Sequence, residues 1–191
     1  MLKLQRAFLA FLFIAFASAS AWADEYTDTI NVFKKAGESG RMFDSAYGYA
    51  VFPTVGKGGV GVGGAYGKGR VYAQGKHVGD SSMTQLSVGF QLGGQAYSQI
   101  IFFQDERSFK EFTGGNFEFG AEASAVAITA AAGAKGSTAG SSAGASAGKN
   151  DAKTVGPGYN KGMATFTVAK GGLMYEASVS GQKFKYKALK T

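Results

Sequence analysis

The stretch from Val51 to Arg70, VFPTVGKGGVGVGGAYGKGR, constrains the fold of this chain more than any other segment. Eight of its twenty residues are glycine. Glycine weakens an isolated strand, but it also lets a second backbone or an aromatic ring approach closely. Val60, Val62 and Tyr66 fall on alternate positions, which is the period of a strand. The stretch therefore predicts a sheet in which glycines permit close packing or sharp bending and aromatic side chains fill the gaps.

A nucleotide-binding loop is the alternative interpretation of the same glycines. Two overlapping windows, beginning at Gly56 and at Gly59, match the pattern G-x-G-x-x-G. That pattern binds a pyrophosphate only where a strand leads in and a helix leads out. Here the following segment, AYGKGRVYAQGK, has no helical period, and no Gly-Lys pair in the chain completes a phosphate loop. We therefore expect no nucleotide and no other cofactor.

The N-terminus has the pattern of a secretory signal peptide. Residues 1–6 carry Lys3 and Arg6, an apolar run follows from Ala7 to Ala17, and SASAWA ends with small residues before Asp24. These features predict cleavage after Ala23 and export to the periplasm or envelope, or secretion from the cell. An uncleaved anchor helix is the alternative, but the run is short for a bilayer, which needs roughly 20 apolar residues.

The predicted mature chain, residues 24–191, has the length of one domain with its own core. It retains 18 basic and 13 acidic residues, a formal net charge of about +5. This balance favours anionic partners but lacks the charge density of a nucleic-acid-binding protein. The chain has no cysteine, so packing rather than disulfides must stabilise the exported fold.

Helical periodicity follows the predicted cleavage site. The segment DEYTDTINVFKKAG puts Tyr26, Ile30 and Phe33 on one face, and Gly37 is a natural end for this helix. A shorter helix is expected around SGRMFDSAYGY. A third is predicted in QDERSFKEFTGG, where Asp105 caps the start and Gly114 ends it.

Beyond Ala50 the period changes from 3.6 to 2. The clearest segment is TQLSVGFQLGGQ, which predicts a half-buried strand. Its apolar side carries Leu86, Val88, Phe90 and Leu92. Further strands are predicted in QAYSQIIFF, in the alternating segment NFEFGAEASAVAITAAAGA, and in KGMATFTVAK, GLMYEASVSG and QKFKYKAL.

The order of these elements predicts an α+β fold. N-terminal helices should pack on a strongly curved, largely antiparallel sheet that resembles half a barrel. Residues 133–148 consist almost entirely of glycine, serine and alanine, and they fit a flexible loop. A pair of strands with small side chains, closely approached by another element, is the alternative.

The residues offer little for catalysis or metal binding. His77 is the single histidine, and without cysteine it cannot complete an ordinary zinc site. A serine–histidine–acid triad would have to use His77 and Asp80, with no nucleophile-elbow motif in the chain. We therefore expect a protein that is not an enzyme, with His77 in an exposed turn.

Several segments together resemble the SYLF-domain family. They are AYGYAVFPTVGKGGVGVGGAYGKGRVY (46–72), LSVGFQLGGQAYSQIIFF (86–103), FKEFTGGNFEFGAEASA (109–125) and AKGGLMYEASVSG (169–181). The resemblance covers essentially the whole mature chain. It implies lipid binding, since eukaryotic relatives recognise phosphoinositides through a basic face and an N-terminal amphipathic segment. Some relatives also bind actin beside an SH3 domain, but this chain has no SH3 domain and its N-terminus predicts export.

The resemblance and the distribution of charge lead to one functional hypothesis. We expect peripheral binding of anionic phospholipid headgroups by the amphipathic N-terminal helix together with a basic face. The candidate lipid-binding residues are Lys34, Lys35, Arg41, Lys57, Lys68 and Arg70. The alternatives are a structural or protein-interaction module of the envelope and a small outer-membrane β-barrel.

Overall fold

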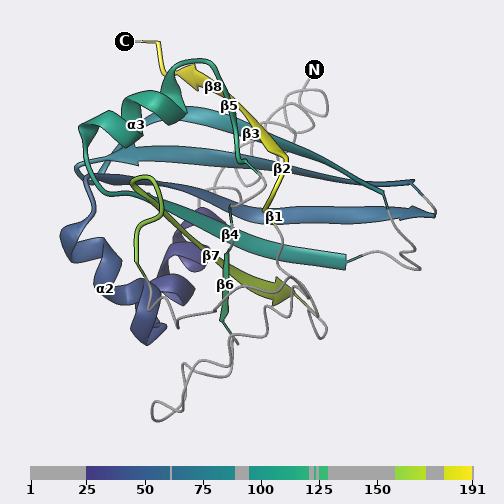
Figure 1. The fold of residues 1–191 in the computed structure, drawn as a ribbon. Helices are drawn as coiled ribbons and strands as arrows, with labels where there is room; N and C mark the ends of the chain where they lie inside the picture. The colour runs from purple at the N-terminus through teal and green to yellow at the C-terminus, as the bar shows by residue number, and fades with distance from the viewer. Residues whose placement is uncertain are drawn as a thin grey trace, which may run out of the picture.

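The computed structural model describes residues 25–60, 62–88, 95–120, 123, 125–128, 158–170 and 179–190. The predicted signal peptide (1–23) and the segment 133–148 lie outside these residues. The described part of the chain contains a helix over residues 25–35, α2 (Gly37–Ser45) and α3 (Glu106–Thr113) (Figure 1). No helix among the described residues is long and apolar enough to cross a membrane.

Eight strands form one sheet. They are β1 (Gly48–Val60), β2 (Val62–Ala73), β3 (Lys76–Val88), β4 (Gln95–Phe103), β5 (Asn116–Glu118), β6 (Val126–Ile128), β7 (Met163–Lys170) and β8 (Gln182–Ala188). Their order in the sheet is β5-β8-β3-β2-β1-β4-β7-β6. All neighbouring pairs are antiparallel except β6 and β7, which run parallel. The predicted α+β class, with helices at the N-terminus and a largely antiparallel sheet, is confirmed.

Hydrogen bonds across the sheet demonstrate its curvature. Gln99 on β4 and Gln182 on β8 are separated by three intervening strands. In a flat sheet such strands would lie roughly 19 Å apart, at about 4.8 Å per step. Yet Gln99 Nε2 donates to Gln182 Oε1 at 2.8 Å. The sheet therefore rolls strongly around an inner side, as the half-barrel prediction requires.

The glycines of β2 make room for the core on this inner side. A Cβ added at Gly69 would lie 2.6 Å from the Phe52 ring, and one at Gly67 would lie 2.8 Å from Val55. Phe52 fills the space above Gly69 and packs against Phe184 across the curved sheet, with ring centroids 5.6 Å apart. The interpretation of the glycine-rich stretch as a closely packed sheet holds at these two positions.

The remaining core divides between the two sides of the sheet. On the inner side, α3 closes the aromatic cluster, which includes Phe103, Phe112 and Phe184. On the outer side, the N-terminal helix and α2 cover β1, β4 and β7, where Phe33 and Met42 pack on Val51, Ile100, Phe102 and Phe166. Figure 1 shows α3 beside the β5 and β8 edge of the sheet and α2 beside its other half.

The predicted signals of α3 are confirmed. The Asp105 side chain accepts a hydrogen bond from the Ser108 backbone N–H at 2.8 Å. In return, the Ser108 hydroxyl oxygen accepts a hydrogen bond from the Asp105 backbone N–H. This capping box satisfies donors that a helix start leaves without partners. Gly114 stands at the C-terminal end, as expected.

The prediction that Leu86 faces the core is wrong. Leu86 is 85% exposed, while its neighbour Gln85 is buried and donates to the Ser180 carbonyl at 2.9 Å. The reason is that the inner side is polar at this level of the sheet: Gln85 lies on the same side as the paired Gln99 and Gln182. Positions 90 and 92 of the same predicted strand lie outside the described residues.

Candidate functional site: the basic outer face

Strand β8 alternates between the two sides of the sheet. Phe184 is buried in the inner aromatic cluster and Tyr186 packs against it. Successive side chains of a strand point to opposite sides, so Lys183, Lys185 and Lys187 project outward, and all three are exposed. This alternation puts three cations in one line along the outer side of β8.

The register of β2, β3 and β8 brings two more cations to the same side. Lys68 lies opposite Ser82, which lies opposite Lys185. Arg70 lies opposite Asp80, which lies opposite Lys187. Residues opposite each other in a sheet share a side, and strands two apart are separated by roughly 10 Å. The basic face is defined by five residues: Lys68, Arg70, Lys183, Lys185 and Lys187.

The acidic side chains of this surface neutralise only part of it. Lys183 pairs with Glu118 on β5 at 3.4 Å. Asp80 lies in the row of Arg70, and its Oδ1 is 3.1 Å from His77 Nε2. Within the described residues, Lys68, Lys185 and Lys187 have no carboxylate at ion-pair distance. Three of the five cations are therefore available to an anionic ligand at little electrostatic cost.

Two large apolar side chains are exposed at one end of the basic face. Tyr66 precedes Lys68 by two residues on β2 and is 51% exposed. Leu86 on β3 lies opposite Gly64, so Tyr66 and Leu86 are diagonal neighbours on the outer side. Lysines beside an exposed aromatic and an exposed aliphatic side chain form a surface suited to a boundary between water and an apolar phase.

Arg70 marks the boundary between the basic face and the helix-covered part of the sheet. Its guanidinium carbon lies 4.2 Å from the centroid of the Tyr26 ring, a cation–π contact with the N-terminal helix. Burial raises the pKa of the Tyr26 phenol, and the Arg70 charge acts in the opposite direction. Next to it, Glu25 Oε1 accepts a hydrogen bond from Thr54 Oγ1 at 2.7 Å and pairs with Lys170 Nζ at 3.3 Å.

The structure does not bring the six residues predicted from sequence into one surface. Lys34 and Lys35 are exposed at the end of the N-terminal helix, and Lys34 lies 5.4 Å from the centroid of the Phe43 ring. Arg41 is exposed on α2. Lys68 and Arg70 belong to the basic face.

Lys57 points to the inner side of the sheet. It follows Val55, which is in the inner cluster, by two residues and lies opposite Ala65, a member of the same cluster. The pairing of β1 shifts between Val51 and Thr54, at an irregularity next to Pro53. Such a bulge exchanges the sides to which all later residues of a strand point. Lys57 and Lys68 therefore face opposite sides of the sheet.

The apolar stripe of the N-terminal helix is already in contact with protein. Phe33 is fully buried, and Tyr26 and Ile30 pack against the same cluster. In this arrangement the stripe is not open to lipid. Insertion of the helix into a membrane would require it to leave the sheet.

Sequence reasoning missed the three lysines of β8. The signal was present, because QKFKYKA places lysine on every second position between two aromatic residues. This pattern predicts one cationic and one buried side of a strand. What the sequence lacked was the register that aligns these lysines with Lys68 and Arg70.

The inner side next to Gln85 holds a network of hydrogen-bonded polar side chains. Gln99 and Gln182 exchange hydrogen bonds, and Gln182 Nε2 also donates to the Tyr97 hydroxyl at 3.2 Å. Burial raises the pKa of Tyr97 to about 12, so the phenol remains neutral. Among the described residues, no three histidine or acidic side chains gather as a metal site would require. The network satisfies its own buried polar groups, which is a structural role.

Comparisons with known proteins identify the class. The family model Ysc84, described as "Las17-binding protein actin regulator", matches residues 84–188. The chain belongs to this family, the SYLF-domain family, and the resemblance inferred from its motifs is confirmed. It is also similar to beta cell expansion factor A of Aeromonas veronii, with 30% identity over 165 residues. That alignment covers 83% of this chain and 52% of the relative, so the chain spans about half the relative's length.

Proposed function

We propose that this protein binds anionic lipid headgroups at a membrane surface, peripherally and without a chemical reaction, through the basic face. The observation that carries the proposal is the register that sets Lys68, Lys185 and Lys187 together without acidic partners among the described residues. Each lysine or arginine near an anionic membrane contributes about 1 kcal/mol. At that value Lys68, Lys185 and Lys187 together contribute about 3 kcal/mol, which supports weak, reversible attachment.

Tyr66 and Leu86 extend the proposed surface. Peripheral membrane proteins gain affinity when apolar side chains enter the boundary between headgroups and acyl chains. Tyr66 adds a ring with a polar tip, which suits that boundary. The pair would orient the end of β2 and β3 that lies away from their hairpin turn toward the bilayer, with the lysines of β8 on the phosphates.

Family membership supports binding to lipid or protein in general. The family description names Las17 binding and actin regulation, which are properties of relatives. The N-terminal pattern of this chain favours export, so we place its proposed lipid target in the periplasm or envelope. Lys34, Lys35 and Arg41, exposed on the helices, would add electrostatic attraction at longer range.

The test is co-sedimentation of the purified protein with vesicles of phosphatidylcholine alone or with added phosphatidylglycerol, at low and high salt. Binding should require phosphatidylglycerol and weaken with salt. The triple variant K183E/K185E/K187E should bind roughly a hundredfold or more weakly, at about 1 kcal/mol for each lysine removed.

The matched control is K34E/K35E/R41E, which changes the net charge by the same amount on exposed helical positions. It should retain most of the binding. If this control loses binding and the β8 variant keeps it, the helices rather than the basic face are the site. If the unmodified protein ignores both kinds of vesicle, lipid binding is wrong and an envelope protein partner becomes the better hypothesis.

A further inference from the structure

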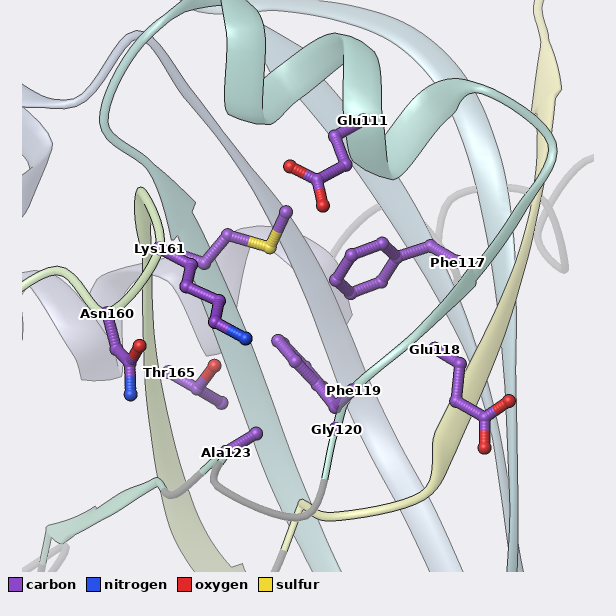
Figure 2. Close-up of a pocket in the computed structure, with 10 residues that line it drawn as sticks. Glu111, Phe117, Glu118, Phe119, Gly120, Ala123, Asn160, Lys161 and Thr165 are labelled. Carbon is purple, nitrogen blue, oxygen red and sulfur yellow. The ribbon is translucent and has the colours of Figure 1, made fainter.

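A cavity opens on the inner side of the sheet, away from the basic face. It has a volume of about 260 Å³ and lies between α3, β5 and the turn before β7 (Figure 2). Phe117, Phe119 and Met163 form its apolar wall, and Glu111, Lys161 and Thr165 supply polar groups. None of these residues belongs to the proposed lipid-binding surface.

The elements around the cavity are fixed against one another. The Gln104 backbone N–H, just before the cap of α3, donates to the Gly162 carbonyl at 2.8 Å. A Cβ added at Gly162 would lie 2.9 Å from the Ser108 Cβ, so the turn packs directly on the first turn of α3. This close contact fixes the position of the turn relative to α3, the helix that carries Glu111, before any ligand binds.

Lys161 has a costly backbone conformation. Its φ is +51°, in the left-handed region, and Gly162 follows with a φ of +82°. Two successive positive φ angles are typical of a tight turn that favours asparagine or glycine. A lysine there costs of order 1 kcal/mol. Gln74 and Gly75 have the same pair of positive φ angles in the turn between β2 and β3, so the geometry is that of an ordinary hairpin turn. The turn thus presents a lysine at a position where glycine would be the easier choice.

Opposite charges face the cavity from its two sides. Figure 2 shows the Lys161 side chain and the Glu111 carboxylate directed toward the same space, with the Phe117 and Phe119 rings beside it. Glu118 is turned away in this view and pairs with Lys183. Glu111 also pairs with Arg107 at 3.4 Å, which leaves the other lone pairs of its carboxylate for a ligand.

We propose that this cavity binds a small zwitterion with an apolar side group, of the α-amino-acid type. Glu111 would accept hydrogen bonds from the ligand ammonium, and Lys161 would donate to its carboxylate. Phe117, Phe119 and Met163 would contact the apolar group. A volume of about 260 Å³ lies just below the usual range of small-molecule sites, about 300–1,000 Å³, and suits a ligand of this small size.

The test uses the methyl resonances of methionine in the purified protein, labelled with ¹³C, because Met163 forms part of the wall. L-Phenylalanine should shift the Met163 signal and leave those of Met42 and Met83 unchanged. Two analogues lack one charge each: 3-phenylpropionate has no ammonium and 2-phenylethylamine has no carboxylate. Each should bind about tenfold or more weakly, since each loses a charge-assisted hydrogen bond.

Three variants separate recognition from folding. Lys161→Gly removes the ammonium and suits the positive φ, so it should be at least as stable as the unmodified protein and yet bind phenylalanine about tenfold more weakly. Glu111→Gln should weaken binding similarly. The control Lys110→Gln, on the same helix but paired with Glu106 at 2.9 Å, should bind normally.

Three results would each overturn this proposal, and none depends on lipid. They are a Met163 signal that no probe moves, equal affinity for phenylalanine and 3-phenylpropionate, and full phenylalanine binding by Lys161→Gly.

Discussion

The outer side of the sheet has a covered half and a bare half, and one row of residues crosses both. In the order of the strands β8, β3, β2, β1, β4 and β7, this row is Lys187, Asp80, Arg70, Val51, Ile100 and Phe166. The first three are charged and the last three are buried. The change occurs between Arg70 and Val51, at the limit of the surface that the N-terminal helix and α2 cover.

This division separates the part of the sheet that stabilises the fold from the part that carries the proposed binding surface. Under the helices, apolar side chains are removed from water and stabilise the fold. On β3, β8 and most of β2, the described elements leave the outer side open, and five cations lie there beside uncharged side chains such as Tyr66 and Leu86. A surface residue away from buried features contributes little to stability. The lysines of the bare half are the residues that the proposed lipid binding would use, and the following predictions test whether the two halves differ in this way.

The largest expected effect belongs to the covered half. Phe166→Ala should lower the free energy of unfolding by about 3–5 kcal/mol, because it leaves a cavity between β7, Phe102 and the helices. Urea denaturation followed by circular dichroism measures this loss. If the variant does not fold, Phe166→Leu should still show a measurable loss, since it removes less volume.

Lys187→Ala is the control within the same row. It should change the free energy of unfolding by less than about 0.5 kcal/mol. Equal losses for Lys187→Ala and Phe166→Ala would contradict the division of the outer side into a stabilising half and a functional half.

A smaller effect is expected at the boundary. Arg70→Ala removes the cation–π contact with Tyr26 and should cost about 0.5–1 kcal/mol of stability. It should also weaken binding to phosphatidylglycerol vesicles. Lys68→Ala, on the same strand, should weaken binding without the loss of stability. If both variants behave alike in urea denaturation, Arg70 does not hold the helix.

Much of the fold could be predicted from the sequence because its signals are local. The helix over residues 25–35 follows from the spacing of Tyr26, Ile30 and Phe33, and α3 from its cap and its terminal glycine. Strands β7 and β8 follow from alternation. Each of these signals depends on residues a few positions apart, so the chain itself displays them.

The assignment of side chains to the two sides of the sheet could not be predicted, because it depends on contacts between distant strands. The irregularity between Val51 and Thr54 turns Lys57 to the inner side, away from Lys68. Leu86 was expected inside because it is apolar. Its neighbour Gln85 is buried instead, since the Ser180 carbonyl, 95 residues away, accepts its hydrogen bond.

The contact that joins the N-terminal helix to the sheet should depend weakly on pH. The hydrogen bond from Thr54, followed by the interaction with Lys170, holds the pKa of Glu25 below its ordinary value, against an opposing effect of burial. A carboxylate with a lowered folded-state pKa stabilises the protein above its unfolded-state pKa, and this contribution is lost as the pH falls through the folded-state value.

Glu25→Gln should therefore reduce stability near neutral pH by less than about 1 kcal/mol, because the pair is exposed to solvent. The difference between the variant and the unmodified protein should shrink as the pH falls below the ordinary pKa of glutamate, near 4.5. Urea denaturation at a series of pH values measures it. A difference that grows toward acid pH would show that Glu25 is not stabilised as a carboxylate.

An equally small effect on stability, together with a clear effect on binding, is expected for Lys185→Ala. This residue is exposed in the middle of the β8 lysines and, within the described residues, has no carboxylate at ion-pair distance. Its removal should leave the free energy of unfolding within about 0.5 kcal/mol. Binding to phosphatidylglycerol vesicles should nevertheless weaken about fivefold, the equivalent of about 1 kcal/mol. Raising the salt concentration should reduce this difference, because screening weakens the contribution of each exposed charge. An effect on binding that is independent of salt would mean that Lys185 contacts its partner through packing and not through charge.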